Sequence, residues 1–599
     1  MKQASSPAAS RGRLLVLSAI GAYFAVLLVG GLLNTDVPVI SPKLIIYLNP
    51  WIYGIALVAV TAILWVYGTI SRTVVAVFTW LATVLYAVYA AASGGSYYLT
   101  FAMCGLVAAV TMLVAPDVTW QKPLVCSPMA GKIAVGSVAV AVGGGTLFLL
   151  LSAYVSHTSS PVMSTGVYAQ MMASLRDSFS MDTTLEFGEA VSHWVAHISP
   201  IFLLYLPFYA LIPSPATLMV LQTLAVFSAV IPLWLIARRK GLSAGVSAAL
   251  CALLCLFPAV WGAAAGGIHE YALLLPLLLW LLWSLESGRR ALVWIFAALV
   301  LCVRETAAIH LVAVGLYWVF SHKDTEENRK VERRQGYLLA ASALVYLIVA
   351  WVVLTYAGKG TLITRYDNVT GMYATDFGTL IREIIFNPAL CLYEMLTEAK
   401  LHYLLCVLLP LGLIPFLSRK KAGLTVLIPL LLLNLLPDFS YHYNTNFPYS
   451  FGVAALLLYL CADALADYQL RRPDGRLAAR WLVVAVCSAV IVGAFRIPDW
   501  KDQVDYAISN DMEYTTITEM LDTLDKDASV SASGRLCVSL ADRSELYSLS
   551  AKADTEYVVL DLRDEWALAG EADYTEEYYE KLGYTKIKEH KGIIAILKK

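Results

Sequence analysis

Arg304 and Glu305 lie side by side in an otherwise apolar part of the sequence, and their chemistry most needs an explanation. The basic turns at 289–290 and 323–334 belong on one side of a membrane by the positive-inside rule. About 30 residues separate these turns, which is too few for two crossings of about 20 residues each. At 1.5 Å per residue, Arg304 would lie roughly 20 Å from the inner surface. Charges at that depth cost several kcal/mol unless they pair or face water, so we expect an ion pair that pins a short hairpin, or a site in a cavity open to the outside.

Two further histidine patterns could contribute to such a site. His269-Glu270 follows the small-residue turn WGAAAGG at the same predicted level, where backbones can approach closely. An ordinary interfacial turn explains it equally well. His193 and His197 have the i, i+4 spacing that places two side chains on one helix face, which suits a metal ion but also occurs on any polar helix face.

The segment 156–215 reads as a large loop outside the membrane that turns back toward it at HISP. It carries carboxylates that could act as bases or metal ligands, although we expect most of them to be solvated: Asp177, Asp182, Glu186 and Glu189. Polar groups gathered beside a membrane face, next to proline-broken helices, are typical of sites in membrane enzymes and transporters.

A second outer loop, 357–400, contains the amphipathic stretch LIREIIF, which we expect to lie on the membrane surface. Arg365 and Arg382 could hold a lipid phosphate, because a guanidinium binds phosphate through two parallel hydrogen bonds. Simple interfacial anchoring is the alternative. The last outer turn, DFSYHYNTNFPYS, adds His442 and several tyrosines, as a sugar-facing surface or an aromatic belt would.

The elements that position these residues are membrane helices. The chain has 599 residues, of which 59% are hydrophobic and only 15% charged, whereas soluble domains carry about 25% charged residues. Hydropathy predicts a polytopic α-helical protein with about fifteen spans, among them the short pair 291–303 and 306–321 and the later spans 401–417 and 422–436. Before residue 497, the predicted inner turns hold 23 lysines and arginines and the outer segments 8, which predicts a cytoplasmic N-terminus. An odd number of spans then places the C-terminus outside.

The tail, residues 497–599, differs in composition from the rest of the chain. It holds 22 of the 44 acidic residues but 12 of the 43 basic ones, a formal charge of −10. A helical pattern at 513–525 precedes the strand-like segments ASVSA, ELYSL and EYVVLDL, a helix around YTEEYYEKL, and a hairpin that turns at Lys591-Gly592. About 100 residues can bury a core, so we expect a small extracytoplasmic α/β domain, which could also be a lid without chemistry.

The order of several short motifs resembles one family. These motifs are a GxYxQ element at Gly166, Tyr168 and Gln170, then HISPIFLLYLPFYAL, Leu221-Gln222, IHEYALLLP, VRET and the tail DASVSASGRL to EYVVLDL. From about residue 133 to 599 the chain resembles the membrane proteins of domain of unknown function 2079. The resemblance implies an added four-helix transmembrane extension at 1–132, a core at 133–496 and the tail domain.

That family is similar in layout to the GT-C glycosyltransferases, which implies a polyprenyl-phosphate sugar donor and an acidic residue in the first outer loop. A carboxylate would deprotonate an acceptor hydroxyl, which attacks the anomeric carbon while an arginine holds the leaving phosphate. The family's loop usually carries two aspartates, and here Ser164 and Ala169 stand in their places. Other acids must then act, or the protein is not a transferase.

We therefore expect a cell-envelope glycosyltransferase whose partners are membrane lipids, a polyprenyl-phosphate sugar and a glycan acceptor, with no nucleic acid. No Walker, HExxH or zinc pattern is present, and the cofactor stays unknown, with a divalent cation left open. A lipid-linked glycan transporter or flippase and a non-catalytic envelope-assembly protein are the alternatives. The candidate catalytic residues are Glu270, Glu305, Asp177 and Asp182, and the candidate substrate-binding residues are Arg304, Arg365, His197, His269, Gln170, Tyr168 and His442.

Overall fold

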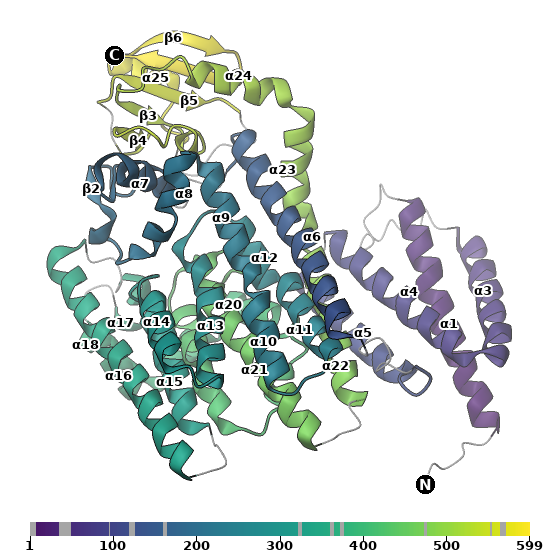
Figure 1. The fold of residues 1–599 in the computed structure, drawn as a ribbon. Helices are drawn as coiled ribbons and strands as arrows, with labels where there is room; N and C mark the ends of the chain where they lie inside the picture. Colours follow the sequence, from purple (N-terminus) through teal and green to yellow (C-terminus); the bar gives the residue numbers. More distant parts are fainter. Residues whose placement is uncertain are drawn as a thin grey trace.

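The computed structural model of this chain describes residues 7–34, 49–94, 96–118, 126–159, 165–321, 326–359, 364–371, 377–471, 476–551, 554–563 and 571–599. These residues form a mostly helical bundle with a small sheet near the C-terminus (Figure 1). Within them, nine helical segments are long and apolar enough to cross a membrane: Arg11–Leu33, Pro50–Ile70, Arg72–Ala92, Tyr97–Val114, Pro128–Val155, Pro215–Arg239, Ala244–Ala265, Lys330–Tyr356 and Pro448–Arg471. Four apolar helices are shorter: Arg290–Leu301, Ala307–Phe320, Lys421–Leu435 and Ala478–Ala494.

The count of about fifteen spans is not confirmed, because several predicted spans are short or interrupted. The predicted span 401–417 is α-helical only in α20 (Glu398–Leu408), after which the chain continues through turns and the 3₁₀ helix η6 (Ile414–Leu417). The predicted span 422–436 consists of the 3₁₀ helix η7 (Lys421–Leu427) and the π-helix η8 (Leu430–Leu435). Hydropathy does not distinguish such broken segments from continuous helices, since it reads composition and not backbone geometry.

Four helices form the N-terminal part of the chain: α1 (Pro7–Leu33), α3 (Pro50–Ile70), α4 (Arg72–Ala92) and α5 (Tyr97–Val114). They lie beside the rest of the bundle (Figure 1). Contact with the core runs through α22 (Arg476–Ala494), where Ala87 and Cys104 share an apolar cluster with Cys487 and Ile491. Helix α3 is the least buried of the nine long segments, so its surface suits a lipid environment.

The core is built around α21 (Phe451–Arg471), part of the most deeply buried of the nine segments. Prolines set several helix starts around it, such as Pro258, which follows an extended Phe257 and separates two helices. The other helices are α6 (Pro128–Val155), α7 (Thr165–Ser178), α8 (Leu206–Leu211), α9 (Pro215–Ser228), α10 (Val230–Arg239), α11 (Ala244–Leu256), α12 (Pro258–Ala265), α13 (Leu274–Glu286), α16 (Glu326–Ala357), α17 (Asp367–Thr370), α18 (Phe377–Phe386) and α19 (Pro388–Met395).

The short hairpin predicted around Arg304 is confirmed. Helix α14 (Arg290–Leu301) and helix α15 (Ala307–Phe320) are 12 and 14 residues long, and Arg304 and Glu305 lie in the turn between them. At 1.5 Å per residue, each helix spans about 20 Å, less than a hydrocarbon layer of about 30 Å. The turn therefore lies deep among the longer helices that surround it.

The C-terminal part folds as the predicted small α/β unit. Its five-stranded sheet has the order β4-β3-β5-β7-β6, in which β3 (Val530–Ala532) pairs in parallel with β4 (Leu546–Ser548) and β5 (Tyr557–Asp561). The predicted hairpin consists of β6 (Thr585–His590) and β7 (Ile594–Lys598), with Gly592 at a φ of 75° in the turn. The accompanying helices are α23 (Ile497–Ser509), α24 (Asp511–Leu521), η11 (Leu536–Val538) and α25 (Glu576–Lys581).

This unit, which we call the C-terminal domain, packs on one end of the bundle (Figure 1). Val167 of α7 and Leu185 belong to the same apolar cluster as Ile517 and Val530 of the domain. We call this end of the bundle the capped end. The basic turns gather at the opposite end, where Lys240 contacts Glu286 and Asp463.

Candidate functional site

Arg304 is the centre of a buried cluster in which five predicted site residues meet. Its Nη1 donates to Glu270 Oε1 at 2.9 Å, its Nη2 contacts His197 Nε2, and its Nε lies 3.5 Å from Glu305 Oε1. His269 Nδ1 lies 2.9 Å from Glu270 Oε2. The five side chains, which the sequence places near one membrane depth, therefore meet; that they also line an outward-facing pocket stays a prediction. We call these five residues the Arg304 cluster.

The hydrogen-bonding roles within the Arg304 cluster follow from the guanidinium, which can only donate. His197 Nε2 must accept from Arg304, so the proton of this ring is on Nδ1, which lies 3.0 Å from Glu305 Oε1 and donates to it. Glu305 Oε2 also accepts from the backbone N–H of Ile198 at 3.1 Å. Glu305 is thus held from two sides, by the loop after η2 (His193–Val195) and by its own neighbour Arg304.

Glu270 is held less completely. Its Oε2 makes no aligned hydrogen bond within the part of the chain that the structure describes, although His269 Nδ1 is 2.9 Å away. Glu270 and Glu305 are each 1% exposed and Arg304 is 2% exposed. One arginine faces two carboxylates here. The cluster therefore has a net charge of −1 unless a histidine or one of the glutamates carries an additional proton.

A second cationic group lies beside the Arg304 cluster. Arg365 Nη1 donates to His442 Nε2 at 3.0 Å, and its guanidinium lies 5.0 Å from the ring of Phe439. The ring of Tyr449 stacks on His442 at 3.9 Å and meets His269 edge-on at 5.8 Å. Arg365 has no carboxylate partner among the described residues, so its charge is oriented by neutral groups and is not cancelled by them.

Asn434 fixes this arrangement from within the π-helix η8. Its side-chain nitrogen donates to the carbonyls of His442 at 2.6 Å and of Tyr449 at 3.2 Å. His442 Nδ1 also lies within hydrogen-bonding distance of the Leu433 carbonyl, which leaves Nε2 as the acceptor for Arg365. The interrupted helix thus supplies the backbone that orients a predicted site histidine.

Tyr168 and Gln170 of α7 have different positions. The Tyr168 ring packs against His269 at 5.4 Å and against His193 at 5.7 Å, so it borders the Arg304 cluster. Gln170 instead holds the loop and the C-terminal domain together: its Oε1 accepts from the Thr184 N–H at 2.9 Å, and its Nε2 donates to the Arg543 carbonyl at 3.0 Å. Its contacts are structural.

The two loop acids do not join the Arg304 cluster. Asp177 is exposed and pairs with its neighbour Arg176, whose guanidinium lowers the pKa of the Asp177 carboxyl. Asp182 is exposed in β1 (Asp182–Thr183), which pairs with β2 (Val191–Ser192). Ala169 lies in α7, whereas Ser164 is outside the described residues.

The prediction of His193 and His197 on one helix face is wrong. His193 begins the single 3₁₀ turn η2, and His197 lies beyond it. The two rings are 5.8 Å apart but serve different acids, because His193 Nδ1 pairs with Glu186 at 2.8 Å and His197 with Glu305. Within the described ranges, no group of three or more histidine, cysteine or acidic side chains is placed to hold a metal ion.

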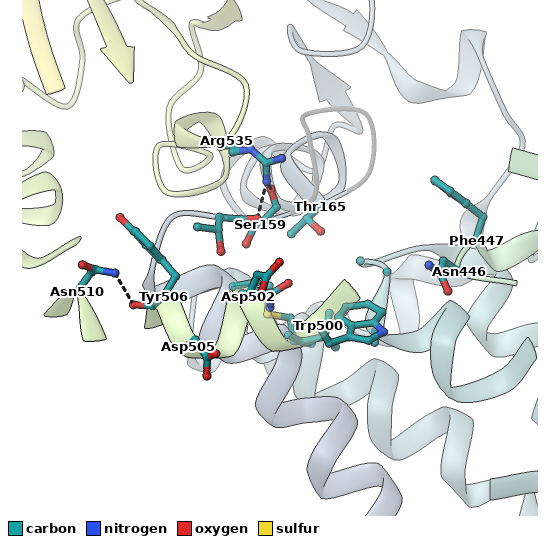
Figure 2. A pocket seen from close by; sticks show the side chains of 18 of the residues that line it. Ser159, Thr165, Asn446, Phe447, Trp500, Asp502, Asp505, Tyr506, Asn510 and Arg535 are labelled. Carbon is teal, nitrogen blue, oxygen red and sulfur yellow. Dashed lines mark hydrogen bonds between the residues drawn. The ribbon is translucent and has the colours of Figure 1, made fainter. Parts of the chain in front are cut away.

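A cavity of about 1000 Å³ lies between the capped end of the bundle and the C-terminal domain (Figure 2). Its wall is formed by α6, α9, the end of α12, the loop at Asn446-Phe447, and α23 with Trp500 and Asp502. The predictions from the sequence do not include this cavity, because they give the residues of α23 no role beyond starting the acidic tail. The signal that could have found it is a tryptophan with two aspartates, Asp502 and Asp505, directly after the last apolar helix.

A thin wall separates this cavity from the Arg304 cluster. Gly267 lines the cavity, and Ile268 and His269 follow it in sequence. Gln222 fixes this strip by donating to the Gly267 carbonyl at 2.8 Å and accepting from the His269 N–H at 2.8 Å. Gly267 has a φ of 134°, which side-chain-bearing residues rarely adopt. The cavity and the cluster are therefore neighbours across three residues of backbone.

Apolar helices of membrane-spanning length, a deep hairpin with paired charges and a capping α/β domain together define a multi-pass membrane protein. The family described as Predicted membrane protein (DUF2079) matches residues 163–595. The chain belongs to this family, and the match extends through the hairpin, both loops and most of the C-terminal domain. The four N-terminal helices lie outside the matched range. No curated protein matches the chain.

Proposed function

We propose that this protein is a membrane glycosyltransferase of the GT-C kind, which transfers a sugar from a polyprenyl phosphate to a cell-envelope glycan at the capped end. The observation that carries the proposal is the Arg304 cluster, which sets two carboxylates and an arginine beside a large cavity. The capped end is the extracytoplasmic one in this proposal, because the basic turns gather at the other end.

Glu270 is the better candidate for the base. It has a carboxylate oxygen without an aligned hydrogen bond in the described structure, and it directly follows the wall of the cavity. Glu305 is held by His197 and by the Ile198 N–H, so its role is to position Arg304 and His197. The acid that the family resemblance placed in the first loop is thus supplied by the turn at His269-Glu270.

Arg365 is the candidate ligand for the donor phosphate. A phosphate would meet an uncancelled guanidinium at Arg365, whereas at Arg304 it would meet two carboxylates as well. In the proposed step, Glu270 takes the proton of the acceptor hydroxyl, and the hydroxyl oxygen forms a bond to the anomeric carbon. The bond from that carbon to the phosphate oxygen breaks, and the lipid phosphate leaves with its negative charge held by Arg365.

The test is release of lipid phosphate from short-chain polyprenyl-phosphate hexoses by the purified protein in lipid nanodiscs, with and without a divalent cation. Glu270→Gln should lower turnover by about 10²-fold or more while the fold is kept. Arg365→Lys should raise KM for the donor, because lysine keeps the charge but loses the planar fork. Asp177→Asn is the matched control, since this acid is exposed and away from the cluster.

Glu305→Gln separates positioning from catalysis. The amide oxygen can still accept from Ile198 N–H, but the charge facing Arg304 is lost, so we expect lower thermal stability with a smaller loss of turnover. Unchanged turnover in both glutamate variants, or no release from any hexose donor by the wild type, would end the transferase proposal.

A second candidate is a non-catalytic role in envelope assembly, and one observation favours it. Both carboxylates of the Arg304 cluster are almost fully buried and face the same arginine, as in a purely structural ion network. This candidate predicts that Glu270→Gln and Glu305→Gln lower stability equally and that no donor is cleaved. The stability of the two variants, measured beside turnover, therefore decides between the two candidates.

A further inference from the structure

The cavity under the C-terminal domain has polar and aromatic groups suited to a ligand and does not include the residues of the Arg304 cluster. Its volume of about 1000 Å³ is at the upper end of the range for small-molecule sites, about 300–1,000 Å³. Leu150, Ala153 and Met219 supply apolar surface, and Asn446, Gln503 and Asn510 contribute amide side chains to the rim. This space suits an extended ligand with many hydroxyl groups better than a single ion.

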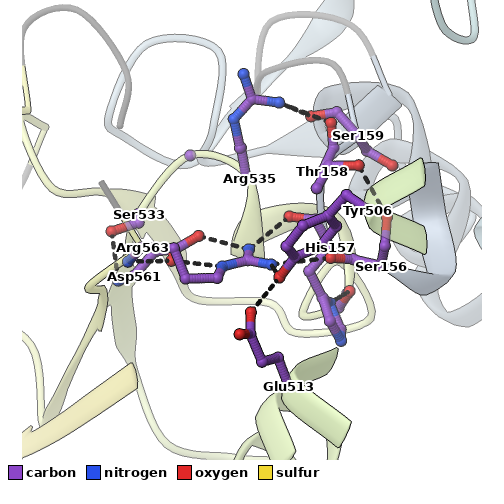
Figure 3. Close-up of polar contacts among 12 residues, drawn as sticks. Ser156, His157, Thr158, Ser159, Tyr506, Glu513, Ser533, Arg535, Asp561 and Arg563 are labelled. Atoms are coloured by element: carbon purple, nitrogen blue, oxygen red, sulfur yellow. Dashed lines mark hydrogen bonds and ion pairs between the residues drawn. The ribbon is translucent and has the colours of Figure 1, made fainter. Parts of the chain in front are cut away.

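The charged side chains that line the cavity disfavour an anionic ligand. Asp502 and Asp505 on α23 are exposed and line the cavity together with one cationic residue, Arg535. Arg535 Nη1 donates to the backbone carbonyls of Thr158 at 2.6 Å and of Ser159 at 3.2 Å (Figure 2, Figure 3). Part of the guanidinium is therefore used in contacts with the protein backbone and is turned away from a ligand. A ligand in this space therefore meets net negative charge, which disfavours a phosphate or an acidic sugar.

Trp500 is the residue best placed to contact such a ligand. Figure 2 shows its ring between Asp502 and the loop that carries Asn446 and Phe447. Its indole nitrogen is shielded from solvent and has no hydrogen-bond partner within the described residues. An indole face combines apolar contact area with an N–H donor, and planar aromatic rings pack against the apolar faces of sugar rings.

We infer that this cavity binds a neutral or amino-bearing oligosaccharide and that it is the acceptor site of the transferase proposed above, on which this assignment rests. Trp500 packs against a sugar ring, Asp502 accepts from hydroxyl or ammonium groups, and Asn446 and Phe447 close the opposite wall. Only the strip from Gly267 to His269 separates the bound glycan from the Arg304 cluster. The C-terminal domain and α23 then select the acceptor, while the bundle holds the lipid-linked donor.

Binding can be measured without any donor, by saturation-transfer NMR and calorimetry on the full chain in nanodiscs. The probes are four trisaccharides of matched length: maltotriose, triacetylchitotriose, the chitosan trimer and trigalacturonate. We expect at least one of the first three to bind, and trigalacturonate to bind at least tenfold more weakly. Trp500→Ala should weaken the binding by about tenfold or more, whereas Trp51→Ala, a change of an 81% exposed tryptophan in the N-terminal helices, should leave it unchanged.

Asp502→Asn tests the charge argument separately, because it keeps the shape and removes one negative charge. This change should reduce the difference in binding affinity between triacetylchitotriose and trigalacturonate. No binding of any trisaccharide, preferred binding of trigalacturonate, or equal binding by wild type and Trp500→Ala would overturn the inference. Glycan binding without donor cleavage would support the glycan site and refute the proposed transferase activity. Donor cleavage and transfer that are unaffected by Trp500→Ala would support the transferase activity and refute the glycan site.

Discussion

Arg563 holds the C-terminal domain to the membrane bundle, and replacing it should free the domain. Its Nη1 donates to the Ser156 carbonyl at 3.0 Å, and its Nη2 donates to the His157 carbonyl at 2.9 Å and to Asp561 Oδ2 at 2.7 Å (Figure 3). Tyr506 of α23 accepts a further bond from Nη1 at 2.7 Å. One guanidinium therefore joins the end of α6, helix α23 and the end of strand β5.

Arg563→Met removes these bonds and leaves the buried Asp561 carboxylate without its guanidinium partner, with the backbone N–H of residue 563 still donating to it. Removing one member of a buried ion pair costs about 3–5 kcal/mol, and the Asp561 side chain is 7% exposed. Arg563→Lys keeps the charge, but a single nitrogen cannot reach the carboxylate and both carbonyls, so we expect a cost of about 1–3 kcal/mol.

Hydrogen exchange in the full chain measures this cost where it arises. An opening that is 3 kcal/mol easier should speed the exchange of β3 and β5 amides by about a hundredfold. The control is Lys581→Met on α25, which removes an exposed pair with Glu577 and should change exchange by less than about threefold. Exchange in Arg563→Met within threefold of wild type would refute the reasoning, and Arg563→Lys provides the same comparison if the methionine variant does not fold.

Three other outcomes are expected. Burial, with the nearby charge of Arg563, lowers the pKa of His157 to about 4. The neutral ring therefore stabilises the docked domain fully above about pH 6.5, and up to about 3 kcal/mol of that stability is lost as the pH falls toward 4. Hydrogen exchange of the β3 amides should become faster over this pH range, and His157→Gln should make this increase smaller. Ser550→Cys, at an exposed position, should react with an impermeant maleimide in intact cells, and labelling only after lysis would reverse the proposed orientation. Gly266→Ala should lower the melting temperature, because its new Cβ would overlap a backbone carbonyl of the facing loop, whereas Gly144→Ala meets open space and should not.

The sequence was sufficient for features that depend on length and local pattern. The hairpin at Arg304 follows from the distance between two basic turns, and the strands of the tail follow from short β-rich segments. The meeting of Arg304 with Glu270 and His197 could also be predicted, because all three were placed near the same membrane depth. Such arguments use only the position of a residue along its own element.

The contacts that could not be predicted from the sequence are those between segments far apart in the chain. Trp500 acquires its surroundings from Asn446 and from Thr158, which lies more than 300 residues earlier in the chain. Gln170 is a candidate substrate ligand because it belongs to the GxYxQ element of the family resemblance, and that element does not predict the contacts of its amide with Thr184 and Arg543. No local sequence pattern predicts either set of contacts, since each forms only when the C-terminal domain, including α23, packs on the capped end of the bundle.

The two arginines at the capped end differ in what surrounds them, and this difference assigns their roles in the proposed reaction. Arg304 lies against two carboxylates, so bringing a phosphate to it requires one of them to move or to gain a proton. Arg365 is oriented by His442 and an aromatic ring, which fix its direction without cancelling its charge. Such preorganised, uncancelled charge stabilises a leaving phosphate at little cost in rearrangement. The Arg304 cluster instead positions the Glu270 carboxylate next to the wall of the cavity. The ring of Tyr449 contacts both His442, which orients Arg365, and His269, which lies beside Glu270, so it spaces the proposed phosphate ligand from the proposed base.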